Sequence, residues 1–124
     1  MARILVVDDE PHIIKLVSYT LERYGHDVLS APDAPTGVTL AKKEVPDLIF
    51  MDVMMPVMTG LQALDMLKSA PETNSIPVVM LSARSQTYEQ EEGLQRGALR
   101  YVTKPFAPSD LMGVVSEVLG IEDE

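Results

Sequence analysis

The side chains best suited to chemistry in this 124-residue sequence directly follow short apolar runs. Asp8 and Asp9 come after Ile4 to Val7, and Asp52 comes after Leu48 to Met51. If these runs lie side by side as strands, about 4.8 Å apart, the carboxylates converge within a few ångströms. Like charges about 4 Å apart repel by roughly 4 kcal/mol per pair at an effective dielectric near 20, so three ionised carboxylates need a compensating cation.

The chemistry of these ligands favours a hard divalent ion. The ligand atoms would all be oxygens, the chain has no cysteine, and we place no histidine in the cluster. Such a site suits Mg²⁺, which usually keeps several waters and shares its coordination shell with a phosphate. A phosphoryl group is therefore the expected companion of the ion.

A lysine and a serine would complete a phosphoryl site. Lys104 offers a positive charge and Ser82 a hydroxyl donor, each near the end of a later apolar segment. Aspartate is an accepted covalent nucleophile, and Asp52 is the natural candidate for phosphorylation. Metal and lysine would together neutralise charge on the moving phosphoryl group, so the transfer needs no separate base.

The elements that must position these groups alternate along the chain. Buried strands are expected at Ile4 to Val7, Val28-Leu29, Leu48 to Met51 and Val78 to Leu81, and the alternation adds Arg100 to Val102. Helices are expected after Pro11, after a cap at Asp33, from near Gly60, after a cap at Ser85 and from near Pro108, with stops at Gly25 and Gly97. The first helix is expected to bury Ile13, Leu16, Val17, Thr20, Leu21 and Tyr24.

This alternation predicts an α/β fold, a doubly wound five-stranded parallel sheet with five helices. Parallel strands require right-handed crossovers, and uninterrupted Val, Ile and Leu strands imply helices on both faces of the sheet. The binding crevice of such a sheet lies beyond the carboxyl ends of its strands, where the polar groups above all fall. The pattern alone leaves the strand order open.

Composition narrows the class of protein. With 46% hydrophobic and 23% charged residues and no linker or repeat, residues 1–124 are expected to form a single domain. Nineteen acidic against ten basic residues give a net charge of −9, which argues against direct nucleic-acid binding. No apolar stretch approaches the ~20 residues of a membrane span, and the N-terminal run is too short for a signal peptide, so we expect a cytoplasmic protein without membrane contact.

Each candidate group has a simpler explanation when it is taken alone. An aspartate pair after a strand is most often a turn or helix cap, a serine there usually caps a helix, and a lysine before proline usually lies at the surface. Asp52 is different, because a carboxylate after four apolar residues needs a partner or partial exposure. Spacing alone favours a core place for Tyr101, packing roles for Met51, Met54, Met55 and Met58, and structural or exposed places for His12 and His26.

Together these residues resemble the receiver domain of two-component response regulators, the CheY-like family, from Ile4 to about Leu119. The matching motifs are Val6-Val7-Asp8-Asp9-Glu10, Asp47-Leu48-Ile49-Phe50-Met51-Asp52-Val53-Met54-Met55-Pro56, Gly60, Pro77-Val78-Val79-Met80-Leu81-Ser82-Ala83, Gly97-Ala98 and Lys104-Pro105-Phe106. The resemblance implies a flavodoxin-like sheet with the order 2-1-3-4-5.

The resemblance also implies a role for each site residue. Asp52 would be the phosphoacceptor, and Asp9 and Asp52 would give carboxylate oxygens to Mg²⁺, with the Met54 backbone carbonyl as a further ligand and Asp8 acting through water. Lys104 would contact the phosphoryl group and precede a cis peptide bond to Pro105. Ser82 and Tyr101 would form the switch, with Ser82 moving toward the phosphoryl oxygens and Tyr101 swinging inward behind it.

The partners implied by the resemblance are proteins. A sensor histidine kinase or histidine phosphotransfer protein would donate the phosphoryl group, and a downstream protein or effector domain would respond. Family members also form homodimers through the face of the fourth helix, fifth strand and fifth helix. The sequence departs from the family pattern at Thr59 before Gly60, at Pro35 in the second helix and at Leu99-Arg100 before Tyr101. Met54 and Arg84 border the place where the family tunes the lifetime of the phosphoryl group.

Three other functions fit parts of the pattern. A Mg²⁺-dependent phosphatase with an aspartyl-phosphate intermediate needs an acid/base aspartate two residues after the nucleophile, where this chain has Met54. A flavodoxin-like cofactor carrier needs a phosphate loop after the first strand, where Asp8 and Asp9 would repel phosphate. An inert scaffold would not need the acceptor, ligands and lysine. We therefore expect a signalling domain rather than an enzyme.

Overall fold

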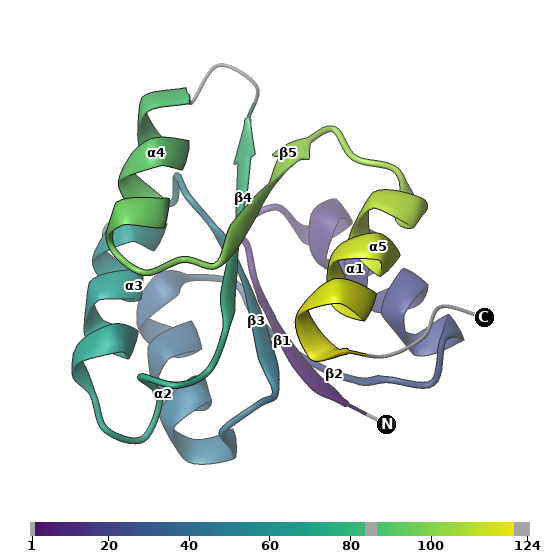
Figure 1. Ribbon diagram of the computed structural model, residues 1–124, viewed down its shortest axis with the longest axis horizontal. Coiled ribbons are helices and arrows are strands. Elements are labelled where there is room, and N and C mark those ends of the chain that lie inside the picture. Colours follow the sequence, from purple (N-terminus) through teal and green to yellow (C-terminus); the bar gives the residue numbers. More distant parts are fainter. Residues whose placement is uncertain (1, 84–86, 121–124) are drawn as a thin grey trace.

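Five strands alternate with five helices in the computed structural model, which describes residues 2–83 and 87–120 (Figure 1). The strands are β1 (Arg3–Val7), β2 (Asp27–Ala31), β3 (Leu48–Asp52), β4 (Val78–Ala83) and β5 (Arg100–Lys104). The helices are α1 (Pro11–Arg23), α2 (Ala34–Glu44), α3 (Gly60–Ser69), α4 (Thr87–Gln95) and α5 (Pro108–Leu119). Arg84, the predicted cap Ser85 and the acidic end at 122–124 lie outside the described residues.

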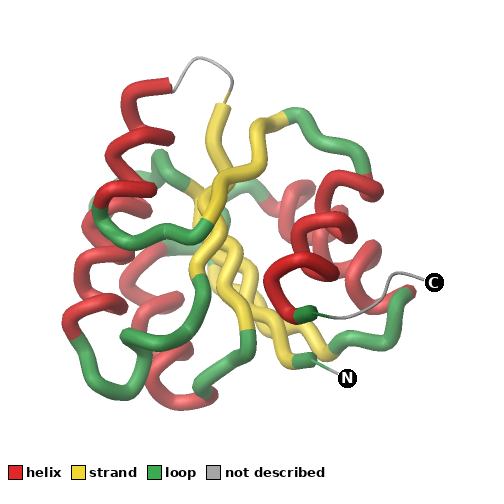
Figure 2. The backbone as a smooth tube through the Cα atoms, in the orientation of Figure 1, coloured by secondary structure: helices red, strands yellow, loops and turns green. Residues whose placement is uncertain are grey.

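The strands form one parallel sheet in the order β2-β1-β3-β4-β5. Helices α1 and α5 cover one face of it, and α2, α3 and α4 cover the other (Figures 1 and 2). The predicted doubly wound α/β fold is confirmed, and so is the strand order that the family resemblance implied.

Two hydrophobic cores lie on the two faces of the sheet because successive strand residues point in opposite directions. In β1, Ile4 and Val6 join a core with α1 and α5, whereas Leu5 and Val7 join a core with α2 and α3. This double burial explains why the strands are apolar without alternation.

Capping residues and glycines mark the starts and ends of the helices largely as predicted. Asp33 caps α2, because its side chain accepts a hydrogen bond from the Thr36 backbone N–H at 2.8 Å. Thr59, the residue that departs from the family pattern, caps α3: its hydroxyl accepts from the Gln62 N–H, and the Gln62 side chain accepts from the Thr59 N–H. Gly25 and Gly97 adopt positive φ after α1 and α4.

One prediction about α1 was too broad. Val17, Thr20 and Leu21 are buried and Ile13 is partly buried, but Leu16 and Tyr24 are exposed. Tyr24 is the residue after the last helical turn and leaves helical geometry. Leu16 lies at the edge of the buried stripe, where it lines a groove with Tyr19 and other residues at the surface of α1.

Among residues 2–83 and 87–120, none of the helices has the length and apolar character needed to cross a bilayer.

Candidate acidic site at the carboxyl edge of the sheet

Three carboxylates meet where β1 and β3 end. The parallel register pairs Val7 of β1 with Met51 of β3, so the residues that follow leave the sheet at the same edge. One carboxylate oxygen from each of Asp8, Asp9 and Asp52 lies within 4.8 Å of the other two. Asp8 and Asp52 are buried and Asp9 is exposed. The predicted convergence is therefore present in the structure.

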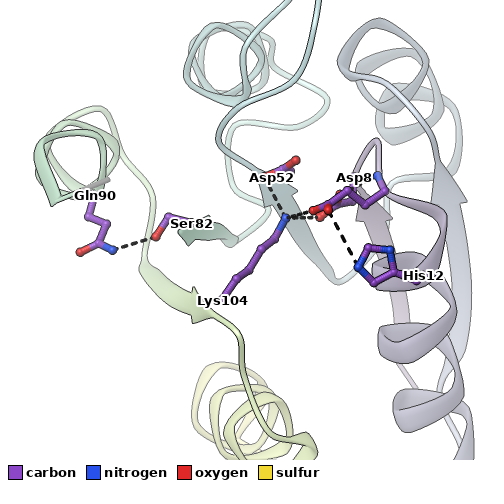
Figure 3. Close-up of polar contacts among 7 residues, drawn as sticks. Asp8, His12, Asp52, Ser82, Gln90 and Lys104 are labelled. Atoms are coloured by element: carbon purple, nitrogen blue, oxygen red, sulfur yellow. Dashed lines mark hydrogen bonds and ion pairs between the residues drawn. The ribbon is translucent and has the colours of Figure 1, made fainter. Parts of the chain in front are cut away.

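Lys104 lies between these acidic groups. Its Nζ is 2.9 Å from Asp8 Oδ2 and 3.2 Å from both Asp52 Oδ1 and Glu10 Oε1 (Figure 3). The side chain crosses from the end of β5 past β4, and it is largely shielded from solvent. The simpler alternative of a surface lysine is wrong for this residue. The bond from Lys104 to Pro105 is cis, as the resemblance implied.

The acidic surroundings change the proton affinity of Asp52. Burial and, next, the negative charge of Asp8 raise the pKa of Asp52, and Lys104 opposes the rise; the net result is a pKa of about 7. Near neutral pH the site therefore holds Asp52 in a mixture of protonated and ionised forms. A cation that binds the carboxylates would have to displace this proton.

The pKa of Lys104 is raised as well, and for a lysine this favours the charged form. Burial by itself lowers the pKa of Lys104, but the hydrogen bond with Asp8 and the charges of Asp52 and Asp8 outweigh it and raise the pKa above its usual value. Lys104 is therefore a fixed positive charge at the end of β5.

One buried oxygen makes the cluster suitable for a metal ion. Asp8 Oδ2 is buried, and within the described part of the chain its one polar contact is with Lys104 Nζ, 2.9 Å away. Burial of a carboxylate oxygen is unfavourable unless its charge is well compensated, and this ammonium group is shared with other carboxylates. Three carboxylates, those of Asp8, Glu10 and Asp52, contact a single ammonium group. Asp9 lies with Asp8 and Asp52 in the same cluster, and oxygen ligands of this kind suit Mg²⁺. The donor set fits the ion that the sequence predicts.

Backbone packing fixes the position of Asp52. The Gly60 N–H donates to the Val53 carbonyl at 2.7 Å, which brings the start of α3 against the end of β3. A Cβ at position 60 would lie 1.9 Å from the Asp52 carbonyl oxygen, so a larger residue would displace this backbone. Gly60, which the sequence marked only as a helix start and motif residue, therefore packs directly against the backbone of Asp52.

The turn after β1 contributes to the same geometry. Asp8 Oδ1 accepts a hydrogen bond from the Glu10 N–H at 2.9 Å, a local turn that leaves the other Asp8 oxygen facing Lys104. The turn interpretation of Asp8 and its place in the cluster are thus both correct. The roles predicted from the sequence did not include one for Glu10, although its position after two aspartates was an available signal. His12 Nε2 lies 3.9 Å from Glu10 Oε2, a contact that the sequence did not predict.

The cluster opens into a cleft of about 300 Å³, room for on the order of ten waters. The cleft is lined by Asp9, Glu10, Asp52, Met54, Ala83 and Lys104. Met54 is 52% exposed, so its side chain stands at the mouth of the cleft rather than in the core, contrary to the packing interpretation. Its role as a carbonyl ligand stays a prediction.

The two residues that the resemblance assigns to a switch, Ser82 and Tyr101, are not among those that line this cleft. Ser82 is buried, and its hydroxyl accepts a hydrogen bond from Gln90 Nε2 at 2.9 Å (Figure 3). Tyr101 is 41% exposed, so the core place favoured by spacing alone is wrong. The buried position of Gln90 was not predicted, because a glutamine within a polar helix carries no signal of burial.

Comparisons with known proteins agree with this fold. The family model of the response regulator receiver domain matches residues 4–116. The chain is 40% identical to protein PilH of Pseudomonas aeruginosa, over 96% of this chain and 98% of PilH. It is also 40% identical to the phosphate regulon transcriptional regulatory protein PhoB of Escherichia coli, over 94% of this chain but only 51% of PhoB.

Solved structures of related proteins share this fold. The chemotaxis protein CheY4 of Vibrio cholerae superimposes with a TM-score of 0.89 at 34% identity, covering 95% of this chain and 98% of CheY4. The receiver domain of NtrX from Brucella abortus has a TM-score of 0.89 at 32% identity, covering 96% of this chain and 99% of that domain.

The parallel sheet and its acidic edge define a doubly wound α/β signalling domain. The chain belongs to the response regulator receiver family of two-component systems, whose members work with histidine kinases and downstream effectors. It spans nearly all of PilH and about half the length of PhoB.

Proposed function

We propose that Asp52 accepts a phosphoryl group from the phosphohistidine of a sensor histidine kinase or histidine phosphotransfer protein, in a Mg²⁺-dependent reaction. The single observation that carries the proposal is the placement of the Asp52 carboxylate. It lies at the cleft, 3.2 Å from Lys104 Nζ and among carboxylates that can hold a cation. The acyl phosphate that results would operate a conformational switch.

The transfer uses few groups of this chain. An ionised Asp52 oxygen forms the new bond to phosphorus while the bond from phosphorus to the donor histidine nitrogen breaks, and that nitrogen keeps the electron pair. Asp9 and Asp52 would hold Mg²⁺, with the Met54 carbonyl as a further ligand and Asp8 contributing through water. The bound ion would supply positive charge to the phosphoryl oxygens.

Lys104 has two roles in this scheme. Before transfer it neutralises part of the charge of Asp8, Glu10 and Asp52. After transfer its ammonium group lies close enough to the acceptor to pair with a phosphoryl oxygen. The added negative charge would then draw the Ser82 hydroxyl toward the phosphoryl group and allow Tyr101 to move inward.

The output surface is proposed to be the face formed by α4, β5 and α5. Tyr101 is partly exposed on this face, and Arg100 of β5 forms an ion pair with Glu117 of α5 there. A downstream protein, an effector domain or a second copy of this chain would bind this face. Residues 1–124 would act in this role as one receiver domain.

Phosphorylation of purified protein tests the proposal. We expect acetyl phosphate or a phosphohistidine donor with Mg²⁺ to label the wild type and Asp27→Asn, which changes an exposed aspartate in β2, but not Asp52→Asn. Phosphate-affinity gels separate the labelled and unlabelled forms. Persistent labelling of Asp52→Asn would place the acceptor elsewhere.

The phosphatase alternative makes a different prediction. The position two residues after Asp52 carries Met54, a half-exposed thioether that cannot exchange a proton with a leaving group. We therefore expect no multiple turnover of a phosphomonoester such as p-nitrophenyl phosphate. Sustained turnover that is lost in Asp52→Asn would favour the phosphatase instead.

A further inference from the structure

Helix α4 is attached to the sheet by an unusual set of side chains. Its buried residues are Gln90 and Gly93, whereas Tyr88 and Leu94 are exposed. Gly93 allows close packing, because a Cβ there would lie 3.3 Å from Met80 Cγ of β4. Over its described residues, Thr87–Gln95, the helix thus lacks the buried apolar stripe that holds a typical surface helix to its domain.

Gln90 supplies a polar attachment in its place. Residues 90 and 93 are three apart, so they share one face of the helix, the face that contacts β4. Gln90 Nε2 donates to the Ser82 hydroxyl at 2.9 Å, and both residues are buried. A buried hydrogen bond between two side chains therefore joins α4 to the end of β4.

The direction of Ser82 follows from the strand period of two. Within β4, Ser82 has the parity of Val78 and Met80, whose side chains belong to the core beneath α2 and α3. Asp52 has the parity of Phe50, which belongs to the opposite core. Figure 3 accordingly shows the Ser82 hydroxyl turned toward Gln90 and away from Asp52 and Lys104.

We propose that Gln90 is a positioning residue that holds the Ser82 hydroxyl away from the acceptor and so couples α4 to the phosphorylation state of Asp52. The inference rests on the proposed function. When Ser82 turns to donate to a phosphoryl oxygen, the hydrogen bond from Gln90 breaks and the buried amide loses this partner. Helix α4 must then move to satisfy the amide, and the hydrogen bond opposes the active state until phosphorylation occurs.

A spectroscopic test uses the wild-type protein. Its ¹⁵N-labelled side-chain amide signals are recorded before and after addition of Mg²⁺ and beryllium fluoride, which mimics a phosphoryl group. The Gln90 signal is assigned by its loss in Gln90→Met. We expect this signal to shift by much more than that of Gln95, whose side chain is exposed to solvent on the same helix. A Gln90 amide that does not shift when backbone signals near Asp52 do would overturn the inference.

Binding affinity gives an independent test. Gln90→Met keeps the length of the side chain but removes the donor, so we expect it to bind beryllium fluoride about fivefold more tightly than the wild type. This corresponds to about 1 kcal/mol. Gln95→Met should bind as the wild type does. In a Ser82→Ala background Gln90→Met should have no further effect, and an undiminished fivefold effect there would show that Gln90 acts independently of Ser82.

The two proposals fail in different ways. If the wild type does not respond to Mg²⁺ and beryllium fluoride, the proposed function is wrong and the inference falls with it. If the wild type responds and Asp52→Asn does not, but Gln90→Met binds with wild-type affinity, only the role of Gln90 is refuted.

Discussion

Replacement of Asp52 by asparagine is expected to make the metal-free protein more stable, although it abolishes the proposed function. Burial and the charge of Asp8 raise the pKa of this carboxyl to about 7 from an ordinary value of 3.8. Because the folded state holds the proton more tightly, ionisation of Asp52 opposes folding. Roughly three pKa units at 1.36 kcal/mol each give a penalty of up to about 4 kcal/mol once Asp52 is fully ionised.

The sign of the effect makes it depend on pH. Below pH 3.8 the carboxyl is protonated in both the folded and unfolded states, so asparagine gains little there. Between pH 3.8 and 7 the folded state binds more protons than the unfolded state, so wild-type stability falls as the pH rises. The advantage of Asp52→Asn therefore grows through this range and is complete above about pH 8.

Urea unfolding with a chelator present measures this difference. At pH 8 we expect Asp52→Asn to exceed the wild type by several kcal/mol in free energy of unfolding, and at pH 4 by less than about 1 kcal/mol. Asp27→Asn, the exposed control, should change stability by no more than about 0.5 kcal/mol at either pH. Equal stability of Asp52→Asn and the wild type at pH 8 would refute the electrostatic reasoning.

Three other perturbations test separate parts of the structure. Mg²⁺ must displace the Asp52 proton, so its affinity by calorimetry should weaken by up to about tenfold per pH unit below 7, and equal affinities at pH 5.5 and 8 would contradict this. Gly60→Ala should lower the free energy of unfolding by at least about 2 kcal/mol and slow phosphorylation. Gly113→Ala, which places its Cβ in open space, should do neither. A phosphorylation rate that is unchanged in Gly60→Ala would contradict the close approach to Asp52. Val57 is 98% exposed at a φ of 74°, so Val57→Gly should raise stability by about 1 kcal/mol, and a loss of stability in urea unfolding would show that this conformation is unstrained.

Sequence patterns were sufficient for the alternation of strands and helices and for the edge of the sheet where the acidic groups lie, whereas the strand order came from the family resemblance. The strand runs, the Asp33 cap and the start of α3 at Gly60 depend on local properties, namely apolar period, capping chemistry and turn residues. Once five parallel strands are accepted, the residues after them must share one edge, which is why Asp8, Asp9 and Asp52 could be grouped in advance.

Predictions were weaker where exposure depends on distant neighbours. Leu16 and Tyr24 match a helical apolar period but lie outside the buried stripe of α1. Tyr101 lies next to Val102 in β5, but β5 is an edge strand, and the tyrosine remains partly exposed. Periodicity identifies the side of an element that can be buried, while the packing of other elements decides how much of that side is covered.

The amino-acid sequence on its own determined which groups reach the carboxyl edge of the sheet, because strand ends and helix starts are encoded by neighbouring residues. The tertiary structure alone decided which of those groups touch. It placed Lys104 against three carboxylates from β1 and β3, and it turned Ser82 toward Gln90. These contacts join residues far apart in the chain, and their geometry depends on how whole helices and strands pack, which no local pattern records.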